Sequence, residues 1–249
     1  MSPFSNAIII GASSGMGAEL ARLLARKRVR TALVARRREA LEELAAGITK
    51  ETPKAPAPLV YPHDVRHFDE VPTLFQRIAH DLGGLDLVVY CAGVMPPVAV
   101  NEYDFGKDRM VYEVNVLGAI AWLNEAAKRF ENQESGVIAA FSSVAGDRGR
   151  KGQPVYSSSK AALNTYMEGL RNRLGHRGVR VVTIKPGPVR TPMTEGLKMP
   201  FMINADEAAR QIWAGIRSSR TTVYVPKKWR AIMWVIRSIP SALFRGKDI

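Results

Sequence analysis

A glycine-rich turn near the N-terminus constrains the fold more than any other feature of this sequence. The apolar, β-branched run at residues 7–10 (Ala-Ile-Ile-Ile) indicates a buried strand. It leads into a Gly-x-x-x-Gly-x-Gly pattern at residues 11–17, which strong helix formers follow at residues 18–25. This order predicts a phosphate cradle, because backbone N–H groups at a helix N-terminus face the anion and glycines let it approach. The alternative is an ordinary tight turn, since the spacing differs from Gly-x-Gly-x-x-Gly.

A second pattern, formed by Ser143, Tyr156 and Lys160, is suited to proton transfer. If the segment is helical, Tyr156 and Lys160 lie four residues apart on one face. Tyrosine has a pKa of about 10, so it is a poor acid or base at neutral pH unless a cation stabilises its anion. Ser143 could hold a substrate oxygen beside the phenol. The Tyr-x-x-x-Lys pair alone also occurs on solvated helix faces, so it indicates a reaction only in combination.

Strand-like and helix-like segments alternate along the chain, which predicts a parallel sheet with right-handed crossovers. A length of 249 residues, 46% of them hydrophobic, suits one α/β domain with a large core. We predict one Rossmann-type doubly wound domain at residues 1–226, with a mostly parallel seven-stranded sheet, and a helical tail at residues 227–249. The predicted strands are residues 7–10, 31–34, 59–61, 85–90, 137–141, 180–184 and 221–225. The predicted helices are residues 18–25, 39–48, 110–130, 155–174 and 205–218.

The C-terminal tail is basic and amphipathic. Residues 210–249 hold nine Lys or Arg against one acid, within a net charge of +13 for the chain. A helix up to about Ile239 would group the apolar side chains Trp229, Ile232, Met233, Ile236 and Ile239 on one side. Such a tail could pack on its own domain, on a partner subunit or on an anionic membrane surface, and we favour packing. The basic residues match no nucleic-acid motif, so no specific nucleic-acid binding is expected.

Taken together, these motifs resemble the short-chain dehydrogenase/reductase (SDR) family, in order from Ile8 to about Pro192. The resemblance implies that Asp64 contacts adenine and that Asn115 completes a catalytic tetrad with the Ser, Tyr and Lys named above. Residues 186–191 match the segment that closes over the nicotinamide. Cys91 departs from the family pattern, because it replaces the asparagine of an Asn-Ala-Gly motif that braces the central sheet.

The end of the second predicted strand favours NADP(H), with NAD(H) as the second choice. Residues 35–38 read Ala-Arg-Arg-Arg with no acid before Glu39, and a basic residue there suits a 2′-phosphate. Arg36 is the preferred partner, because its guanidinium binds phosphate bidentately and stacks on adenine. A solvated basic helix start is the alternative. The residues predicted to bind the cofactor are Gly11, Ser13, Ser14, Gly15, Met16, Gly17, Arg36, Arg37, Asp64, Val65, Cys91, Ala92, Gly93, Tyr156, Lys160, Pro186, Gly187, Val189 and Thr191.

The resemblance implies an oxidoreductase that exchanges hydride between a nicotinamide and a carbonyl or secondary alcohol. Tyr156 would be the general acid or base and Ser143 would hold the substrate oxygen. Lys160 would lower the pKa of Tyr156 and hold the nicotinamide ribose, while Asn115 would anchor a water. The alternatives are a catalytically silent dinucleotide-binding regulator and an SDR that acts on lipid-like substrates at a membrane surface.

The substrate itself is expected to be a small and apolar carbonyl or alcohol. Residues 192–203 are rich in Met, Leu and Phe and predict an apolar pocket wall. Arg150 and Lys151 in a neighbouring loop could attract an acid, but loop charges more often do nothing specific. In the family, the helices predicted at 110–130 and 155–174 commonly pair subunits, so a homodimer or homotetramer is expected.

The remaining features bear on metals and location. Cys91 is the only cysteine, which excludes an internal disulfide, and the four histidines have no metal-ligand spacing. We therefore predict no metal site and treat the histidines as surface or loop residues. A first strand within about six residues and the lack of a long apolar run predict a cytoplasmic protein, peripheral on a membrane at most.

Overall fold

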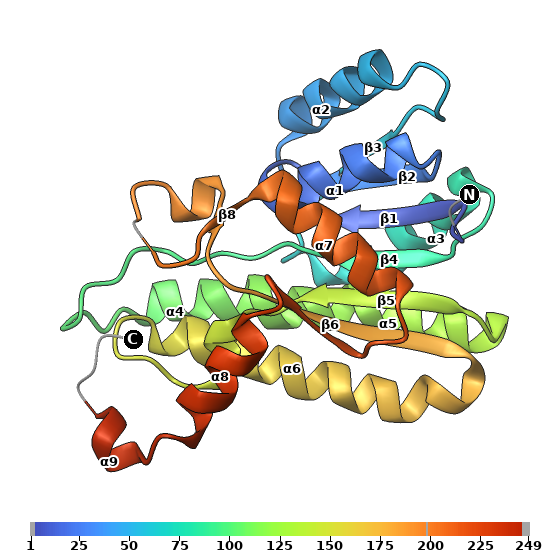
Figure 1. Cartoon of the computed structure of the whole chain (residues 1–249). Helices are drawn as coiled ribbons and strands as arrows, with labels where there is room; N and C mark the ends of the chain where they lie inside the picture. The colour runs from blue at the N-terminus through green and yellow to red at the C-terminus, as the bar shows by residue number, and fades with distance from the viewer. Residues whose placement is uncertain (1–2, 198, 246–249) are drawn as a thin grey trace.

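A seven-stranded sheet forms the centre of the molecule (Figure 1). The computed structural model describes residues 3–197 and 199–245. The strand order is β3-β2-β1-β4-β5-β6-β9 and every neighbouring pair is parallel. The strands are β1 (Asn6–Ile10), β2 (Arg30–Ala35), β3 (Leu59–Pro62), β4 (Leu87–Tyr90), β5 (Gly136–Phe141), β6 (Val179–Pro186) and β9 (Thr222–Val225). The predicted doubly wound Rossmann-type fold is confirmed, and each predicted strand forms within two residues of its expected bounds.

Helices cover both faces of the sheet. One face carries α1 (Gly15–Arg26), α2 (Arg38–Glu51) and α7 (Ala205–Arg217), and the other carries α3 (Val71–Leu82), α5 (Gly118–Gln133) and α6 (Pro154–Leu174). Successive strand residues point to opposite faces, so Ile9 of β1 packs in the first layer while Ile8 and Ile10 pack in the second. Burial on both sides explains why the strands are continuously apolar rather than alternating.

The strand order reverses between β1 and β4, and this reversal positions the functional site. Both neighbours of β1 run parallel to it, so the turn after β1 and the segment after β4 emerge at the same edge. In open α/β sheets the crevice at such a switch point is where ligands bind. The glycine turn and the Cys91-Ala92-Gly93 segment therefore lie side by side.

Two helices differ from the prediction. The helix predicted at 110–130 begins earlier, as α4 (Phe105–Tyr112), passes through a π-helical turn (Glu113–Leu117) and continues as α5. Asp104 starts it, because its carboxylate accepts hydrogen bonds from the backbone N–H groups of Gly106 and Lys107. The sequence reading missed α3, whose proline in the first turn is tolerated there because that N–H has no helical partner.

A small parallel ladder joins β7 (Val189–Arg190) to β8 (Ile203–Asn204). The segment between them is the predicted substrate wall, and the ladder fixes its two ends together. Strands this short have no hydrophobic period that could predict them. Lys198 of that segment lies outside the described residues.

The tail folds back onto the domain as α8 (Trp229–Ser238) and α9 (Ser241–Phe244), at the lower left of Figure 1. Its apolar side chains Trp229, Met233 and Ile236 are buried together with Val144, which follows Ser143. Arg148 Nη1 donates to the carbonyls of Ile236 (2.5 Å) and Ile239 (2.6 Å). Its guanidinium also lies 3.9 Å from the ring centroid of Phe244.

The apolar side of α8 predicted from the sequence, which includes Trp229, Met233 and Ile236, is the side that packs against the domain. The boundary between residues 226 and 227 stays a prediction, and residues 246–249 of the predicted tail lie outside the described residues. Within the described ranges, no helix is both long enough and apolar enough to cross a membrane. Of the histidines, His63 differs from the expected surface position, because its side chain is 2% exposed and its ring packs edge-on against Trp122.

Candidate active site

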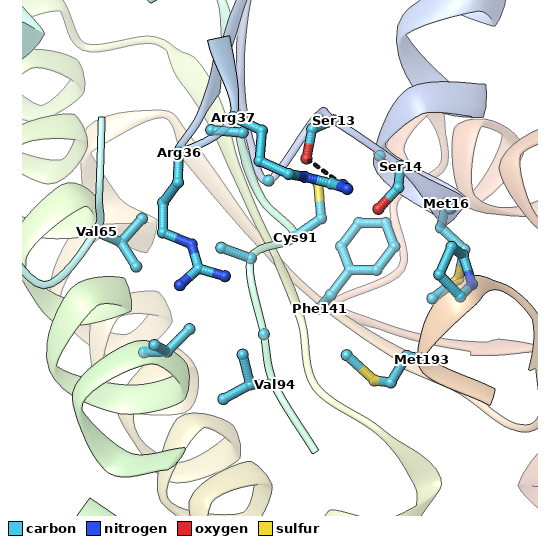
Figure 2. Close-up of a pocket in the computed structure, with 18 of the residues that line it drawn as sticks. Ser13, Ser14, Met16, Arg36, Arg37, Val65, Cys91, Val94, Phe141 and Met193 are labelled. Carbon is cyan, nitrogen blue, oxygen red and sulfur yellow. Dashed lines mark hydrogen bonds between the residues drawn. The ribbon is translucent and has the colours of Figure 1, made fainter. Parts of the chain in front are cut away.

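The predicted phosphate cradle forms one end of a cleft of about 240 Å³ (Figure 2). A Cβ on Gly11 would lie 2.4 Å from the backbone nitrogen of Ala92, and one on Gly17 would lie 2.4 Å from the Gly11 carbonyl oxygen. The strand, the turn and α1 can therefore pack this closely only with glycine at both positions. Ser14 precedes α1 and its side chain does not cap the helix, so the first N–H groups stay available to an anion.

Two arginines reach the same cleft from the end of β2. Arg37 Nη2 donates to Ser13 Oγ at 3.2 Å, which draws its guanidinium toward the glycine turn. Arg36 points the other way in Figure 2, toward Val65. Both arginines line the cleft. A phosphate on the adenosine ribose would thus meet two cations at the position where NAD-specific proteins place an acid.

The adenine end of the cleft holds Asp64 and Val65. Burial by itself would raise the pKa of Asp64, but hydrogen bonds from Arg66 and the nearby charge of Arg36 lower it. The Arg66 guanidinium binds both carboxylate oxygens, with Nη2 2.7 Å from Oδ2 and Nε 3.1 Å from Oδ1. Asp64 is therefore an ionised acceptor held in place beside the cleft, whereas the sequence expected only an adenine contact.

Cys91 occupies the family's asparagine position with little polar bonding. Its backbone N–H donates to the Ile10 carbonyl at 2.8 Å, which continues the pairing of β4 with β1. Its thiol lies 4.0 Å from the Val89 carbonyl oxygen, a weak contact, and burial strongly raises the pKa of the thiol. The cysteine stays neutral and apolar, so the backbone alone braces the sheet here.

These features fit a dinucleotide. The cleft offers a glycine cradle at a helix N-terminus for the pyrophosphate, two guanidinium groups at the adenosine end, and apolar walls from Val65, Val94 and Met193. Of the residues predicted to bind the cofactor, those lining this cleft are Gly11, Ser13, Ser14, Gly15, Met16, Gly17, Arg36, Arg37, Asp64, Val65, Cys91, Ala92, Gly93 and Thr191. Phe141 also lines it and was not predicted, because nothing in its local sequence marks it, and Met193 was expected only in the substrate wall at residues 192–203.

Ser143 and Tyr156 meet beyond the other end of this cleft. Ser143 Oγ accepts from the backbone N–H of Ala145 at 3.0 Å and so begins a short 3-10 helix (Val144–Asp147). Burial raises the pKa of Tyr156, and a hydrogen bond with Ser143 and the charge of Arg150 oppose that rise. The neighbouring Ser142 donates to the Lys160 carbonyl at 3.0 Å. The hydrogen bond with Tyr156 thus comes from Ser143, the serine that the sequence pairs with this phenol.

Lys160 is buried on α6, one helical turn after Tyr156. Its Nζ donates to the Phe141 carbonyl at 2.9 Å and lies 5.7 Å from the Tyr156 ring centroid. Burial lowers the pKa of Lys160 to about 8. The charge of Arg150 lowers the pKa of Tyr156, an interaction that the sequence did not anticipate.

Asn115 lies in the π-helical turn and is fully buried. Its Oδ1 accepts from the backbone N–H of Val94 at 2.8 Å, and its Nδ2 donates to the Val94 carbonyl at 3.0 Å. A further bond joins Nδ2 to Ser159 Oγ at 3.2 Å. The side chain therefore clamps the segment after β4 onto α6, and its expected role in holding a water stays a prediction.

A second cavity, of about 430 Å³, opens on the same phenol. Its walls come from the loop after β5, the start of α6, the segment after β6 and the predicted apolar wall at residues 192–203. The predicted residues Ser143, Tyr156, Pro186, Gly187, Val189 and Thr191 line it, together with Met95, Val144, Met193, Leu197 and Met199. Apart from a few polar groups the surface is apolar, as the composition of residues 192–203 predicted.

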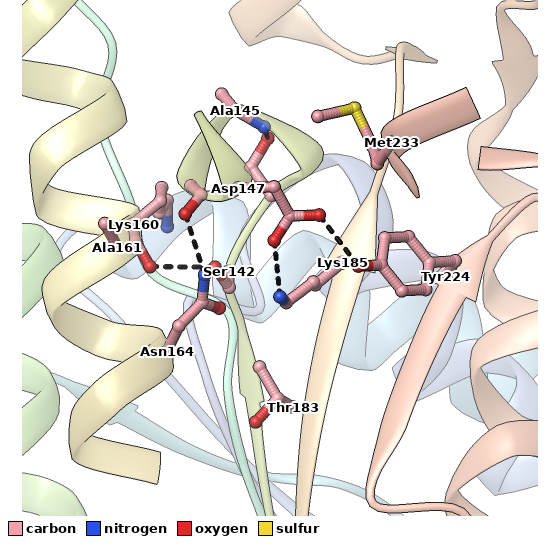
Figure 3. Close-up of polar contacts among 12 residues, drawn as sticks. Ser142, Ala145, Asp147, Lys160, Ala161, Asn164, Thr183, Lys185, Tyr224 and Met233 are labelled. Atoms are coloured by element: carbon pink, nitrogen blue, oxygen red, sulfur yellow. Dashed lines mark hydrogen bonds and ion pairs between the residues drawn. The ribbon is translucent and has the colours of Figure 1, made fainter. Parts of the chain in front are cut away.

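A buried polar network fixes the wall of this second cavity (Figure 3). Asp147, whose side chain is 2% exposed, lies 2.5 Å from Lys185 Nζ through Oδ1. Its Oδ2 accepts from the Tyr224 hydroxyl at 2.7 Å. The network ties the loop of Ser143 to β6 and β9, and no sequence motif predicts that these three residues meet. Among the described residues, no cluster of His, Cys, Asp or Glu could hold a metal ion.

Comparison with known proteins identifies the family. The sequence profile of the family described as short chain dehydrogenase matches residues 5–200. An uncharacterized oxidoreductase of Myxococcus xanthus is 34% identical over 248 residues, covering 97% of this chain and 95% of that protein. One of Staphylococcus saprophyticus is 34% identical over 188 residues, covering 76% and 80%. The chain belongs to the short-chain dehydrogenase/reductase family and is an NAD(P)-dependent oxidoreductase.

Solved structures share the fold over almost the whole chain. A short-chain dehydrogenase of Burkholderia cenocepacia in complex with NADP superposes with a TM-score of 0.83 at 23% identity, covering 96% of this chain and 95% of that one. A short-chain dehydrogenase of Sphingobium yanoikuyae in complex with NADPH gives a TM-score of 0.81 at 24% identity, covering 98% and 99%. The bulky-bulky ketone specific alcohol dehydrogenase of Comamonas testosteroni gives 0.79 at 23%, covering 97% of each chain.

Proposed function

We propose that this chain is an NADP(H)-dependent carbonyl reductase or alcohol dehydrogenase with Tyr156 as its general acid and base. The observation that carries the proposal is the convergence of Tyr156 and Ser143 on an apolar cavity that adjoins a dinucleotide-shaped cleft. The nicotinamide, when bound, supplies or accepts the hydride.

The residues of this chain then have separate tasks. Ser143 donates a hydrogen bond to the substrate oxygen, and Tyr156 donates its proton to that oxygen as negative charge develops on it. In the reverse direction the phenolate accepts the proton of the alcohol. Lys160 holds the ribose hydroxyls, and its ammonium favours the phenolate once the site is assembled. The clamp that Asn115 places on Val94 keeps the cofactor wall rigid.

The choice of NADP(H) over NAD(H) is part of the same proposal. Arg36 and Arg37 both line the cleft, and no acidic residue stands at the end of β2. The structural relatives of Burkholderia and Sphingobium named above were solved with NADP and NADPH, which agrees with this choice. Arg36 is assigned to the 2′-phosphate, because it projects freely while Arg37 is bonded to Ser13.

The test is a titration with NADPH and NADH, read by nicotinamide fluorescence, followed by turnover on a panel of ketones and aldehydes. Tight NADPH binding with carbonyl-dependent oxidation that Tyr156→Phe abolishes would support the enzyme. Binding of NADPH without turnover on any carbonyl would favour the silent regulatory protein instead. Failure to bind either nucleotide would reject the proposal.

Contact with a membrane surface is a second candidate role, favoured by the outer face of α8. Trp234 is 72% exposed and Val235 54% exposed, and Arg230 and Arg237 on the same helix are also exposed. A Trp-bearing basic face of this kind binds anionic lipid surfaces. Co-sedimentation with phosphatidylserine vesicles at low salt, with Trp234→Ser as the comparison, tests this role. Equal sedimentation of both proteins, or none of either, would count against it.

A further inference from the structure

Arg150 places a positive charge in the wall of the substrate cavity. It stands in the loop between Asp147 and α6, a few residues before the catalytic Tyr156. Lys151 lines the cavity as well, and most of the remaining lining is apolar, as at Met95, Leu197 and Met199. Among the described residues, no aspartate or glutamate lines it. The field inside the cavity therefore favours an anion.

The guanidinium of Arg150 forms no ion pair with a carboxylate of the described chain. The polar contact that it makes is with the thioether of Met233, with Nη2 4.0 Å from Sδ, and thioether sulfur is a weak acceptor. The acid that acts on it electrostatically is Asp147. Both oxygens of that carboxylate are already bound, one by Lys185 and the other by Tyr224. Arg150 thus keeps nearly all of its donors for a ligand.

Arg150 is half-buried, so part of its hydration is lost without a ligand. This burial lowers the pKa of Arg150, and the interaction with the phenol of Tyr156 opposes that change. A bound carboxylate would offset the partial desolvation through charge-assisted, bidentate hydrogen bonds. Met233 comes from the C-terminal tail, so the tail helix forms the support behind the cation.

We propose that Arg150 binds the carboxylate of an apolar keto acid whose carbonyl lies against Tyr156 and Ser143. This inference rests on the proposed function and narrows its substrate class. In the reaction the carbonyl carbon gains a hydride from NADPH and the carbonyl oxygen gains a proton from Tyr156. A hydroxy acid and NADP⁺ are formed, and the carboxylate on Arg150 is unchanged.

The experiment compares methyl-ketone carboxylic acids of increasing chain length, each beside its own methyl ester. The two members of a pair share the reacting group and differ in the charge, so their ratio of kcat/KM isolates the anion site. We expect the wild type to favour the best acid over its ester by roughly 10- to 100-fold. Arg150→Gln should reduce this ratio to about one, mainly through KM for the acid, and Arg150→Lys should keep part of it.

The control removes the same charge from a position outside the cavity. Arg220 is exposed in the loop before β9, and Arg220→Gln is expected to keep the wild-type ratio. A second readout needs no turnover: octanoate and octanol are titrated into the NADPH-loaded protein and followed by cofactor fluorescence. Octanoate should bind more tightly than octanol to the wild type and to Arg220→Gln, and lose this advantage in Arg150→Gln.

The outcomes separate this inference from the function on which it rests. Reduction of esters and acids with equal efficiency, or equal losses on both in Arg150→Gln, would overturn the carboxylate site while leaving the reductase intact. Arg150→Gln could instead shift the pH profile for every substrate without changing the acid-to-ester ratio of kcat/KM. That result would also overturn the carboxylate site, and Arg150 would then act only on the pKa of Tyr156. Absence of turnover on all carbonyls rejects the reductase, and the octanoate titration then decides the anion site by itself.

Discussion

The cofactor cleft and the substrate cavity meet at the same edge of the sheet, but they are built in different ways. The cleft is formed mostly by residues that follow β1, β2, β3 and β4, with Val114, Phe141 and residues 191–193 added from further along the chain. Apart from Met16, the cavity gathers segments from residue 95 to residue 199, and its wall is held by contacts with β9 and α8. Strand ends therefore supply most of the cleft, whereas contacts between segments far apart in the chain shape the cavity.

The largest expected effect separates chemistry from cofactor binding. Tyr156→Phe removes the hydroxyl that Ser143 contacts but keeps the ring, and should lower kcat by roughly 10²- to 10⁴-fold. The dissociation constant for NADPH should stay within a factor of about two, because the ring does not line the cofactor cleft. Steady-state kinetics and a fluorescence titration check both parts. An equally large loss of NADPH affinity would show that the two regions are not separable.

The next effect concerns the polar network that supports the cavity. Asp147→Asn leaves the buried ammonium of Lys185 without its counter-charge, and should lower the free energy of unfolding by about 3 kcal/mol. Urea denaturation measures this, and carbonyl turnover should fall while NADPH still binds the folded protein. Asp206→Asn is the matched control, because Asp206 forms a solvent-exposed ion pair with Arg210, one helical turn away. An equal fall of the urea midpoint in Asp206→Asn and Asp147→Asn would contradict the stabilising role assigned to the pair of Asp147 and Lys185.

A third change tests the cleft alone. Arg36→Gln should weaken NADPH binding by roughly 10- to 100-fold while altering NADH binding little, because the lost charge-assisted bonds go to the 2′-phosphate. Isothermal titration with both nucleotides checks the ratio. Arg38→Gln, at the next-but-one position and outside the cleft lining, is the control and should preserve the preference. If Arg36→Gln weakens the binding of both nucleotides equally, Arg36 does not bind the 2′-phosphate.

The smallest expected effect is on pH dependence. The pKa of Lys160 is about 8 in the unliganded protein, because burial disfavours its charged form. The ammonium is the form that donates to the ribose, so NADPH binding should be constant below about pH 8 and weaken as pH rises, by up to tenfold per pH unit. Fluorescence titration across this range measures it. Lys160→Met should bind weakly and without this slope, and the same slope in both proteins would assign it to another group.

The sequence predicted the cleft well because its signals are local. Gly17 is required by a contact within the strand-turn-helix unit, and Arg36 follows the strand that carries it. Gly11 also faces the segment after β4, but the glycine pattern that marks it is local. The same holds for Tyr156 and Lys160, whose spacing is one helical turn. The early start of the helix at Phe105 and the burial of His63 were missed, since one depends on a cap and the other on packing against Trp122.

The substrate side could not be predicted in the same way. Asp147, Lys185 and Tyr224 are far apart in the chain and belong to no motif, and their meeting follows from the order of β5, β6 and β9 in the sheet. Arg150 looked like an ordinary loop charge until the fold set it in a cavity without acids.

By itself, the sequence determined the strand-turn-helix cradle, the parallel sheet and the placement of Tyr156 and Lys160 one helical turn apart, because hydrophobic periodicity and residue spacing act over a few neighbouring residues. Only the tertiary structure decided which side chains line the substrate cavity, which charge faces Tyr156 and how the tail supports that wall. Those properties depend on desolvation and on the distances between segments, which exist only once the chain has folded.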